Sequence, residues 1–256
     1  MAPRPDGETA GADQPAAHRD SSESATAKVL QEELIGFSSR AGHDLLGPLN
    51  QAASLLALLV KRYRNELDAG ADVILDHLVN AAAKMETVTE GVRRYLNLAG
   101  RPIEYGAVDL STALSSALAV LEPVVKSSGA TVTADALPIV ECGSAQMIAT
   151  FEILIDNAIK FRRPEEAPRV HVSVVPDGAC VRLAVTDNGI GIDPKYWQEV
   201  VLPFRRLNGR EYPGAGLGLA TARLIARLHG GGLEVESTPG AGTTVTVRLP
   251  GRAVAG

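Results

Sequence analysis

The sequence is poor in cysteine, in aromatic residues and in long apolar runs, and each shortage excludes a class of protein. Its 256 residues include two cysteines, Cys142 and Cys180, which are too few for a disulfide framework and lack the spacing of metal ligands. No apolar run approaches the ~20 residues of a membrane-spanning helix. The net charge of -5 gives no basic footprint for nucleic acid. We therefore expect a cytoplasmic protein that binds neither membranes nor nucleic acids.

The first hundred residues change character near Lys28. Residues 1–26 are rich in Ala, Pro, Ser, Asp and Gly, a composition that predicts a disordered tail. Apolar residues then recur every three or four positions up to Leu59, and again after a break at 65–71. This pattern predicts an all-α antiparallel hairpin over residues 27–100. A lone hairpin buries only part of its apolar stripes, so we expect a homodimer whose hairpins form a four-helix bundle. The second stripe consists of Ile74, Leu78, Ala81, Met85, Val88, Val92 and Tyr95.

Beyond Pro102 the pattern becomes mixed, which predicts an α+β two-layer sandwich over residues 109–252, joined to the hairpin by a linker at 101–108. Asp109 or Ser111 and then Ser144 are expected to cap its first two helices. The expected helices are 109–127, 144–161 and 217–228, and the expected strands are 130–134, 139–142, 169–175, 180–186, 233–237 and 243–249.

His43 stands out on the first predicted helix. At 100° per residue it lies ~220° from the apolar stripe, so it is expected to face solvent. Asp44 can hold one ring N–H and raise the basicity of the other nitrogen, which suits a nucleophile. Pro48, preceded by Gly47, removes the helical hydrogen bond to the Asp44 carbonyl and weakens the helix there by ~3 kcal/mol. Bundle packing does not require this weakness, so His43 and Asp44 are the candidate catalytic residues, against the alternative of an ordinary surface histidine.

Three further segments could together hold a nucleotide. Asn157 and Lys160, at i and i+3 of a helix, could reach Mg²⁺ and a phosphate. Asp187 ends a strand and could accept the amine of adenine, while Gly189 and Gly191 let the base approach the backbone. A glycine-rich loop at 214–218 opens a helix, where free N–H groups bind phosphate. Taken singly, each is as readily a solvated helix face or a turn.

Together with His43, the order and spacing of these segments resemble the histidine kinase family, in its phytochrome-type branch, over most of residues 28–250. Residues 43–49, 157–161, 187–191, 204–207 and 214–219 resemble its phosphoacceptor, asparagine, first glycine, phenylalanine and second glycine boxes. The resemblance implies a Bergerat (GHKL) ATP-binding fold, ATP and Mg²⁺ as cofactors, and a lid at about 190–216. The implied nucleotide-binding residues are Asn157 (also the metal ligand), Lys160, Asp187, Gly189, Gly191, Arg206, Gly214, Gly216, Leu217, Gly218 and Thr243.

The sequence departs from the family pattern at two positions. Ile153 stands where the family usually has a second asparagine, which predicts weaker binding or slower use of ATP. Gly47 stands where many relatives have a Thr or Asn that positions water for dephosphorylation, so little phosphatase activity is expected by that route.

These features predict a protein histidine kinase that phosphorylates His43 from ATP and passes the phosphoryl group to an aspartate of a response regulator receiver domain. The linker would act as the hinge that brings the nucleotide to His43, and the input signal would come from a separate sensor protein or from transcriptional control. A non-catalytic histidine phosphotransfer adaptor with a degenerate ATP-binding domain is the main alternative. Two other classes fit less well. An ATP-driven clamp needs a further domain that this sequence lacks, and serine kinases that regulate sigma factors lack the long hairpin predicted here.

Overall fold

The computed structural model describes residues 51–63, 69–207, 212, 214–250 and 253–254. The predicted tail at 1–26 and the candidate catalytic residues His43 and Asp44 lie outside these residues. Of the helices within the described residues, none is both long and apolar enough to cross a membrane.

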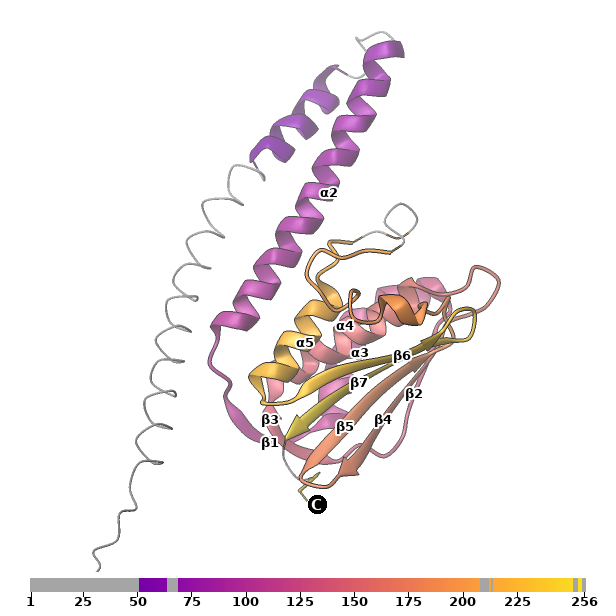
Figure 1. Ribbon diagram of the computed structural model, residues 1–256. Coiled ribbons are helices and arrows are strands. Elements are labelled where there is room, and N and C mark those ends of the chain that lie inside the picture. Colours follow the sequence, from indigo (N-terminus) through magenta and orange to yellow (C-terminus); the bar gives the residue numbers. More distant parts are fainter. Residues whose placement is uncertain (1–50, 64–68, 208–211, 213, 251–252, 255–256) are drawn as a thin grey trace, which may run out of the picture.

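The helical part of the chain contains residues 51–63 and α2 (Ala69–Gly100), the long helix that extends beyond the rest of the molecule in Figure 1. The helix ends at Gly100, as predicted, but it begins at Ala69, inside the break that we expected at 65–71. Ala53, Leu75 and Ala82 are buried, whereas Ile74 and Leu78 of the predicted stripe are 61% and 38% exposed. A single chain therefore leaves much of the apolar stripe of α2 facing solvent.

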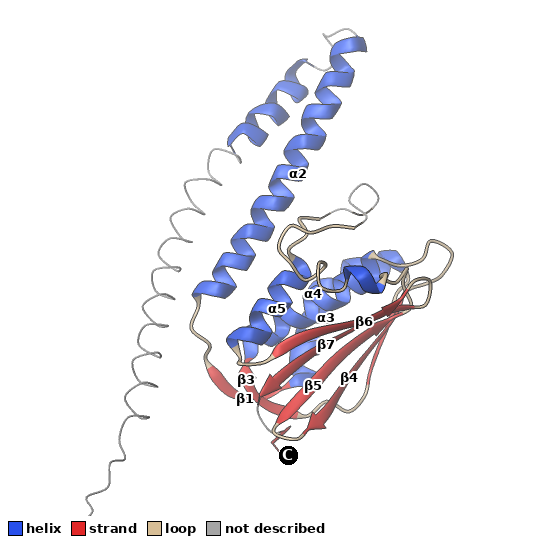
Figure 2. Ribbon diagram, viewed as in Figure 1, coloured by secondary structure: helices blue, strands red, loops and turns tan. Residues whose placement is uncertain are grey.

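The α+β part is a two-layer sandwich, which confirms this part of the predicted fold. Five strands form a mixed sheet in the order β2-β4-β5-β7-β6, in which only β2 and β4 pair in parallel. Figure 2 shows α3, α4 and α5 covering one face of this sheet. The strands are β2 (Thr131–Ala134), β4 (Arg169–Asp177), β5 (Cys180–Asp187), β6 (Gly232–Thr238) and β7 (Gly242–Pro250), and the helices are α3 (Leu110–Ser128), α4 (Ser144–Lys160) and α5 (Gly218–Leu228).

The core lies between the sheet and its helices. Alternate residues of the central strands point into it, because successive side chains of a strand face opposite sides of the sheet. Phe151, Ile155 and Ile159 of α4 are fully buried against them. The strand residues of this layer are Val170, Val172, Val174, Val181, Leu183, Val185, Val245, Val247 and Leu249. Burial of α4 in this way fixes which of its faces remains for a ligand.

A second, smaller sheet corrects the predicted linker. It consists of β1 (Tyr105–Asp109), β3 (Ile139–Gly143) and β8 (Ala253–Val254), in the order β1-β3-β8. The second half of the segment 101–108 is therefore part of a strand paired antiparallel with β3, and residues 101–104 alone connect α2 to it. The strand was missed because it is only five residues long and mostly exposed, and its pairing depends on a strand about thirty residues further along the chain.

Helix capping follows the sequence at α3 but not at α4. The Asp109 side chain accepts a hydrogen bond of 2.8 Å from the Ser111 N–H, which confirms Asp109 as the N-cap. The prediction that Ser144 caps α4 is wrong, because Gly143 is the N-cap and makes no side-chain cap bond. The β3 strand runs directly into α4, and the N–H of Gly143 instead donates to Nε2 of the buried His229, at 3.1 Å.

Candidate functional site

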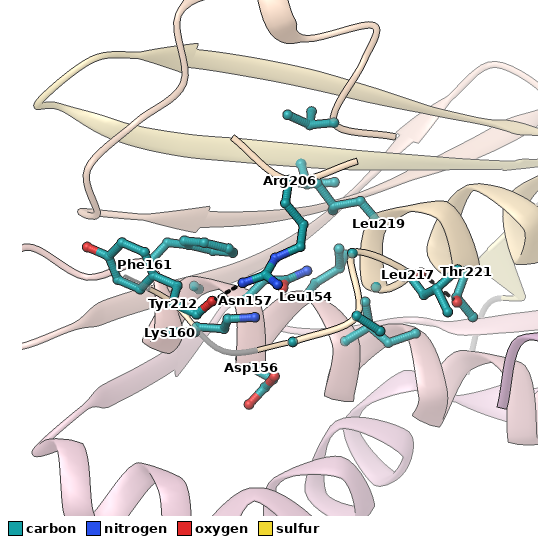
Figure 3. A pocket seen from close by; sticks show the side chains of 18 of the residues that line it. Leu154, Asp156, Asn157, Lys160, Phe161, Arg206, Tyr212, Leu217, Leu219 and Thr221 are labelled. Atoms are coloured by element: carbon teal, nitrogen blue, oxygen red, sulfur yellow. Dashed lines mark hydrogen bonds between the residues drawn. The ribbon is translucent and has the colours of Figure 1, made fainter. Parts of the chain in front are cut away.

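A cavity of about 580 Å³ lies between α4, the segment from β5 to α5, the strand β7 and the helix α2. Figure 3 shows side chains from α4 and from the segment before α5 converging on it, with Asn157, Lys160 and Arg206 gathered at one end. Its size is in the range of small-molecule sites. Most of the residues predicted from the sequence line it: Asn157, Lys160, Asp187, Gly191, Arg206, Gly214, Gly216, Leu217, Gly218 and Thr243.

Asp187 is a largely buried carboxylate at the end of β5. Its Oδ1 accepts hydrogen bonds from the N–H groups of Gly189, at 2.7 Å, and Thr243, at 3.1 Å. Burial raises the pKa of Asp187 above its ordinary value, and these two bonds oppose the rise. No described residue donates to Oδ2, so this oxygen can accept from a ligand in the cavity.

The hydroxyl of Thr243 is fixed by Ser237, a residue that sequence reasoning missed. Ser237 Oγ lies 2.9 Å from Thr243 Oγ1, accepts from the Ile192 N–H and donates to the Gly242 carbonyl. Ser237 is on β6 and Thr243 on β7, at paired positions of the hairpin. Only this register brings them together, and nothing in the local sequence around Ser237 indicates it.

Gly189 and Gly191 allow the chain after β5 to pass close to its neighbours. A Cβ at Gly189 would lie 2.5 Å from the Phe161 carbonyl oxygen, and Gly191 has a positive φ of 70° with the Thr238 carbonyl directly in the way of a Cβ. Any side chain at Gly191 would therefore be both strained and in collision. Gly189 does not line the cavity itself but donates to Asp187, so its role is to hold the carboxylate.

Another part of the cavity lies between α4 and the glycine loop before α5. A Cβ at Gly218 would lie 3.1 Å from Asn157 Nδ2, and one at Gly214 would lie 2.5 Å from Lys160 Nζ. The amide and the ammonium therefore lie directly against this loop. The N-terminus of α5 has no side-chain cap bond, so its free N–H groups are available to an anion.

The charges at this end favour an anionic ligand. Burial lowers the pKa of Lys160, Asp156 opposes the shift, and Arg206 adds to it. Burial raises the pKa of Asp156, against the effects of Lys160 and Arg94. A phosphate group would relieve the mutual repulsion of Lys160 and Arg206, since both cations would gain a counter-charge.

Arg206 and two aromatic rings close the end of the cavity. Arg206 donates to the Tyr212 carbonyl at 2.5 Å, the dashed line of Figure 3. The Tyr212 ring lies 5.1 Å from that of Phe161, whose face in turn lies 5.0 Å from Lys160 Nζ. Phe161, which was not predicted as a site residue, is therefore part of the cavity wall. A further lid arginine, Arg210, lies outside the described residues.

One wall of the cavity comes from α2 and was not predicted at all. Thr87, Glu90, Gly91 and Arg94 of α2 line it from outside the α+β part of the chain. Sequence reasoning assigned this helix to dimerisation and considered only its apolar stripe. Contact between two separate parts of the fold leaves no periodic signal in the sequence.

Ile153 lines the cavity beside Gly218 and is 7% exposed. Its Cγ2 would lie 3.5 Å from a Cβ at Gly218. The apolar residue that departs from the family pattern therefore faces the site, one turn before Asn157.

Comparison with known proteins agrees with this geometry. Residues 144–253 match the family model described as histidine kinase-, DNA gyrase B- and HSP90-like ATPase. The chain is 39% identical over 219 residues to cyanobacterial phytochrome A of Nostoc sp. and 33% identical to the phytochrome-like protein Cph1 of Synechocystis sp.. The chain belongs to the histidine kinase family. Each alignment covers 85% of this chain but only 28% and 29% of the respective phytochrome, so the chain spans under a third of these relatives.

Solved histidine kinases share the fold. The structure of ShkA in complex with AMPPNP matches 86% of this chain and 46% of its own, with a TM-score of 0.63 and 22% identity. The kinase AdeS of Acinetobacter baumannii matches 81% of this chain and 97% of its own, with a TM-score of 0.55 and 18% identity. At these identities the likeness extends to the fold alone.

Proposed function

We propose that this chain is an ATP-dependent protein histidine kinase that phosphorylates itself on His43. The observation that carries the proposal is that a largely buried carboxylate and a glycine loop at a helix N-terminus line a single cavity. Asp187 offers Oδ2 to the amine of adenine, with the Thr243 hydroxyl held beside it. Asn157, Lys160 and the start of α5 offer an amide and cationic and N–H groups to a triphosphate. The family relationship and the AMPPNP bound by ShkA support ATP as the ligand.

The residues present fit Mg²⁺ bound together with ATP. No described residues form a cluster of three or more His, Cys, Asp or Glu that could hold a metal alone. Mg²⁺ in nucleotide sites commonly takes one or two protein oxygens and completes its shell with phosphates and water. Asn157 Oδ1 would supply such an oxygen, and the bound ion would neutralise charge on the phosphates.

The proposed reaction is in-line transfer of the γ-phosphoryl group. One ring nitrogen of His43 attacks the γ-phosphorus, the new N–P bond forms, and the bond from phosphorus to the ADP oxygen breaks with its electron pair on ADP. Asp44 orients the ring through its other nitrogen and takes the proton released there. The phosphohistidine then donates to an aspartate of a response regulator receiver domain.

Counting along the chain supports His43 as the acceptor. The described helical residues 51–63 end, and α2 begins at Ala69, on either side of position 66. Counted from position 66, His43 lies as far back along the chain as Thr89 of α2 lies forward. An antiparallel hairpin centred there would bring the predicted acceptor to the level of α2 at which the cavity lies, between Thr87 and Arg94. The exposed apolar residues of α2 also support a homodimer, because a second hairpin would bury them.

Labelling with γ-³²P-ATP tests the proposal. We expect the wild-type chain with Mg²⁺ to gain label that is lost in acid and stable in base, and His43→Gln to gain none. His77→Gln, which changes an exposed histidine of α2, is the matched control and should label like the wild type. Label that survives in His43→Gln, or the absence of label in a wild-type chain that binds ATP, would contradict the assignment of His43.

The non-catalytic adaptor remains the second candidate because of Ile153. A buried isoleucine at this place gives neither a metal ligand nor a hydrogen bond. Calorimetry with ATP separates the two proposals: an adaptor with a degenerate domain gives no binding heat, whereas a kinase binds ATP in the presence of Mg²⁺.

A further inference from the structure

The contact between α2 and the ATP-binding domain is close and specific. Arg94 Nη2 lies 2.5 Å from Glu152 Oε2 on α4, and this ion pair joins residues 58 positions apart. The Glu152 side chain is 16% exposed and that of Arg94 41% exposed. Three positions earlier on α2, a Cβ at Gly91 would lie 3.0 Å from Ala215 Cβ and 3.1 Å from Leu217 Cδ1.

Glycine at position 91 destabilises α2, and the close contact with the loop before α5 explains why a glycine is needed there. In a helix interior glycine is less favourable than alanine by about 1 kcal/mol. Ala215 and Leu217 belong to the glycine loop that opens α5, so the missing side chain lets α2 lie directly against the loop proposed to hold phosphate. Leu98, further along α2, packs against the core of the ATP-binding domain and extends the same contact.

The contact covers the phosphate end of the cavity. Asp156 interacts electrostatically with both Lys160 and Arg94, which places Arg94 beside the residues proposed to bind phosphate. Thr87, Glu90, Gly91 and Arg94 form the wall there. In-line attack on the γ-phosphorus needs an imidazole at this end. With α2 in place, its side chains form the wall on that side of the cavity.

We infer that Arg94 and Glu152 are positioning residues that hold the ATP-binding domain on α2 in a resting arrangement, with the nucleotide cavity facing α2. Breaking the ion pair and separating Gly91 from Ala215 frees the domain to turn toward the segment of the chain that carries His43. Residues 101–104, the short connection between α2 and β1, allow this rotation. The effect on phosphorylation rests on the proposed function, whereas the docking itself does not.

An engineered disulfide tests the docking without any activity. Gly91→Cys with Ala215→Cys places two Cβ atoms close to disulfide distance, with a relaxation of about 0.5 Å or more needed to reach the usual 3.5–4.5 Å. The background carries Cys180→Ser, because Cys180 is partly exposed. Cys142 is left in place, since burial raises its pKa to about 11 and keeps it an unreactive thiol. We expect the full chain to form an intramolecular cross-link under mild oxidation.

The ion pair is tested in the same assay. Arg94→Ala should slow cross-linking by about two- to fivefold, the effect expected of a partly exposed ion pair. Arg93→Ala is the matched control, because Arg93 is the neighbouring arginine and pairs with Glu90 of its own helix. The swap Arg94→Glu with Glu152→Arg should restore the rate. Equal rates in Arg94→Ala and Arg93→Ala, or no cross-link in the parent, would overturn the inference.

Locking and unlocking the disulfide then tests the resting state. In the oxidised variant we expect ATP binding to persist and labelling of His43 to fall by about tenfold or more, with recovery on reduction. Undiminished labelling in the locked form would show that docking is not a resting state. If the double variant does not fold, hydrogen exchange of the backbone at 215–221 serves instead, and it should be faster in Arg94→Ala than in Arg93→Ala. Equal exchange would overturn the inference as well. The failure of the kinase proposal would appear separately, as absent label in the reduced form.

Discussion

The substitution Asp187→Asn separates the function of this carboxylate from its effect on stability. In the structure, Oδ1 of Asp187 accepts from the N–H groups of Gly189 and Thr243, and Oδ2 is available to the cavity. The amide oxygen of the variant could keep both bonds. Its amide nitrogen would then present a donor to the adenine amine, which is also a donor, so both would lose a partner.

The size of the effect follows from the bond that is lost. A hydrogen bond to a charged group contributes about 1.5–3 kcal/mol, so Asp187→Asn should weaken ATP binding by roughly 10- to 150-fold. The fold should not be weakened. Burial raises the pKa of Asp187 in the folded state, so its ionised form is less favourable there than in the unfolded chain. At a pH above the folded-state pKa, the ionised carboxylate therefore lowers the free energy of unfolding. Removing the charge should leave the free energy of unfolding at pH 7 unchanged or slightly higher.

Calorimetry with ATP and Mg²⁺, paired with thermal unfolding, measures both quantities on the same samples. Asp177→Asn is the matched control, since Asp177 ends the neighbouring strand and pairs at the surface with Arg248. It should bind ATP like the wild type. Wild-type affinity in Asp187→Asn, or a fall in its Tm large enough to account for the lost binding, would refute the role given to Oδ2.

Two further predictions concern the scaffold around the site. Burial lowers the pKa of His229 below its ordinary 6.5, although a backbone carbonyl opposes this, and neutral Nε2 accepts from Gly143. The free energy of unfolding should therefore be constant above about pH 7 and fall as the pH drops below about 6.5. Urea unfolding at several pH values measures this, and the fall due to His229 should be absent in His229→Gln. Gly242→Ala would drive a Cβ into the Asp187 carbonyl at a positive φ of 112°, whereas Gly240, at 77°, has open space around it. Thermal unfolding should show Gly242→Ala to cost about 2–5 kcal/mol and Gly240→Ala about 1–2 kcal/mol, and equal losses would argue against the clash.

Much of the fold was predictable because its signals are local. Period-two alternation placed β4 to β7 within two residues, and helical periodicity with the Asp109 cap placed α3. The errors fall where structure depends on distant partners. β1 was taken for a linker because its pairing with β3 leaves no signal in its own five residues. Ser144 was taken for a cap because serine is a common N-cap residue, whereas in the structure β3 runs directly into α4.

The candidate site shows the same division. Asn157, Lys160 and Asp187 were found because their residue types, order and spacing are unusual together, and the structure brings them around one cavity. Ser237, the α2 wall and the place of Phe161 were missed. Each of them takes part in the site only through strand register or through packing of one part of the fold on another.

By itself, the sequence determined most of the elements, the family and the chemical groups at the site, because helical and strand periods, glycine-rich turns and the positions of carboxylates and amides are local properties of the chain. The tertiary structure decided which oxygen of Asp187 is left for a ligand, how closely Gly214 and Gly218 approach Lys160 and Asn157, and that Arg94 of α2 pairs with Glu152. These are distances between segments far apart in the chain, and only packing of the whole fold sets them.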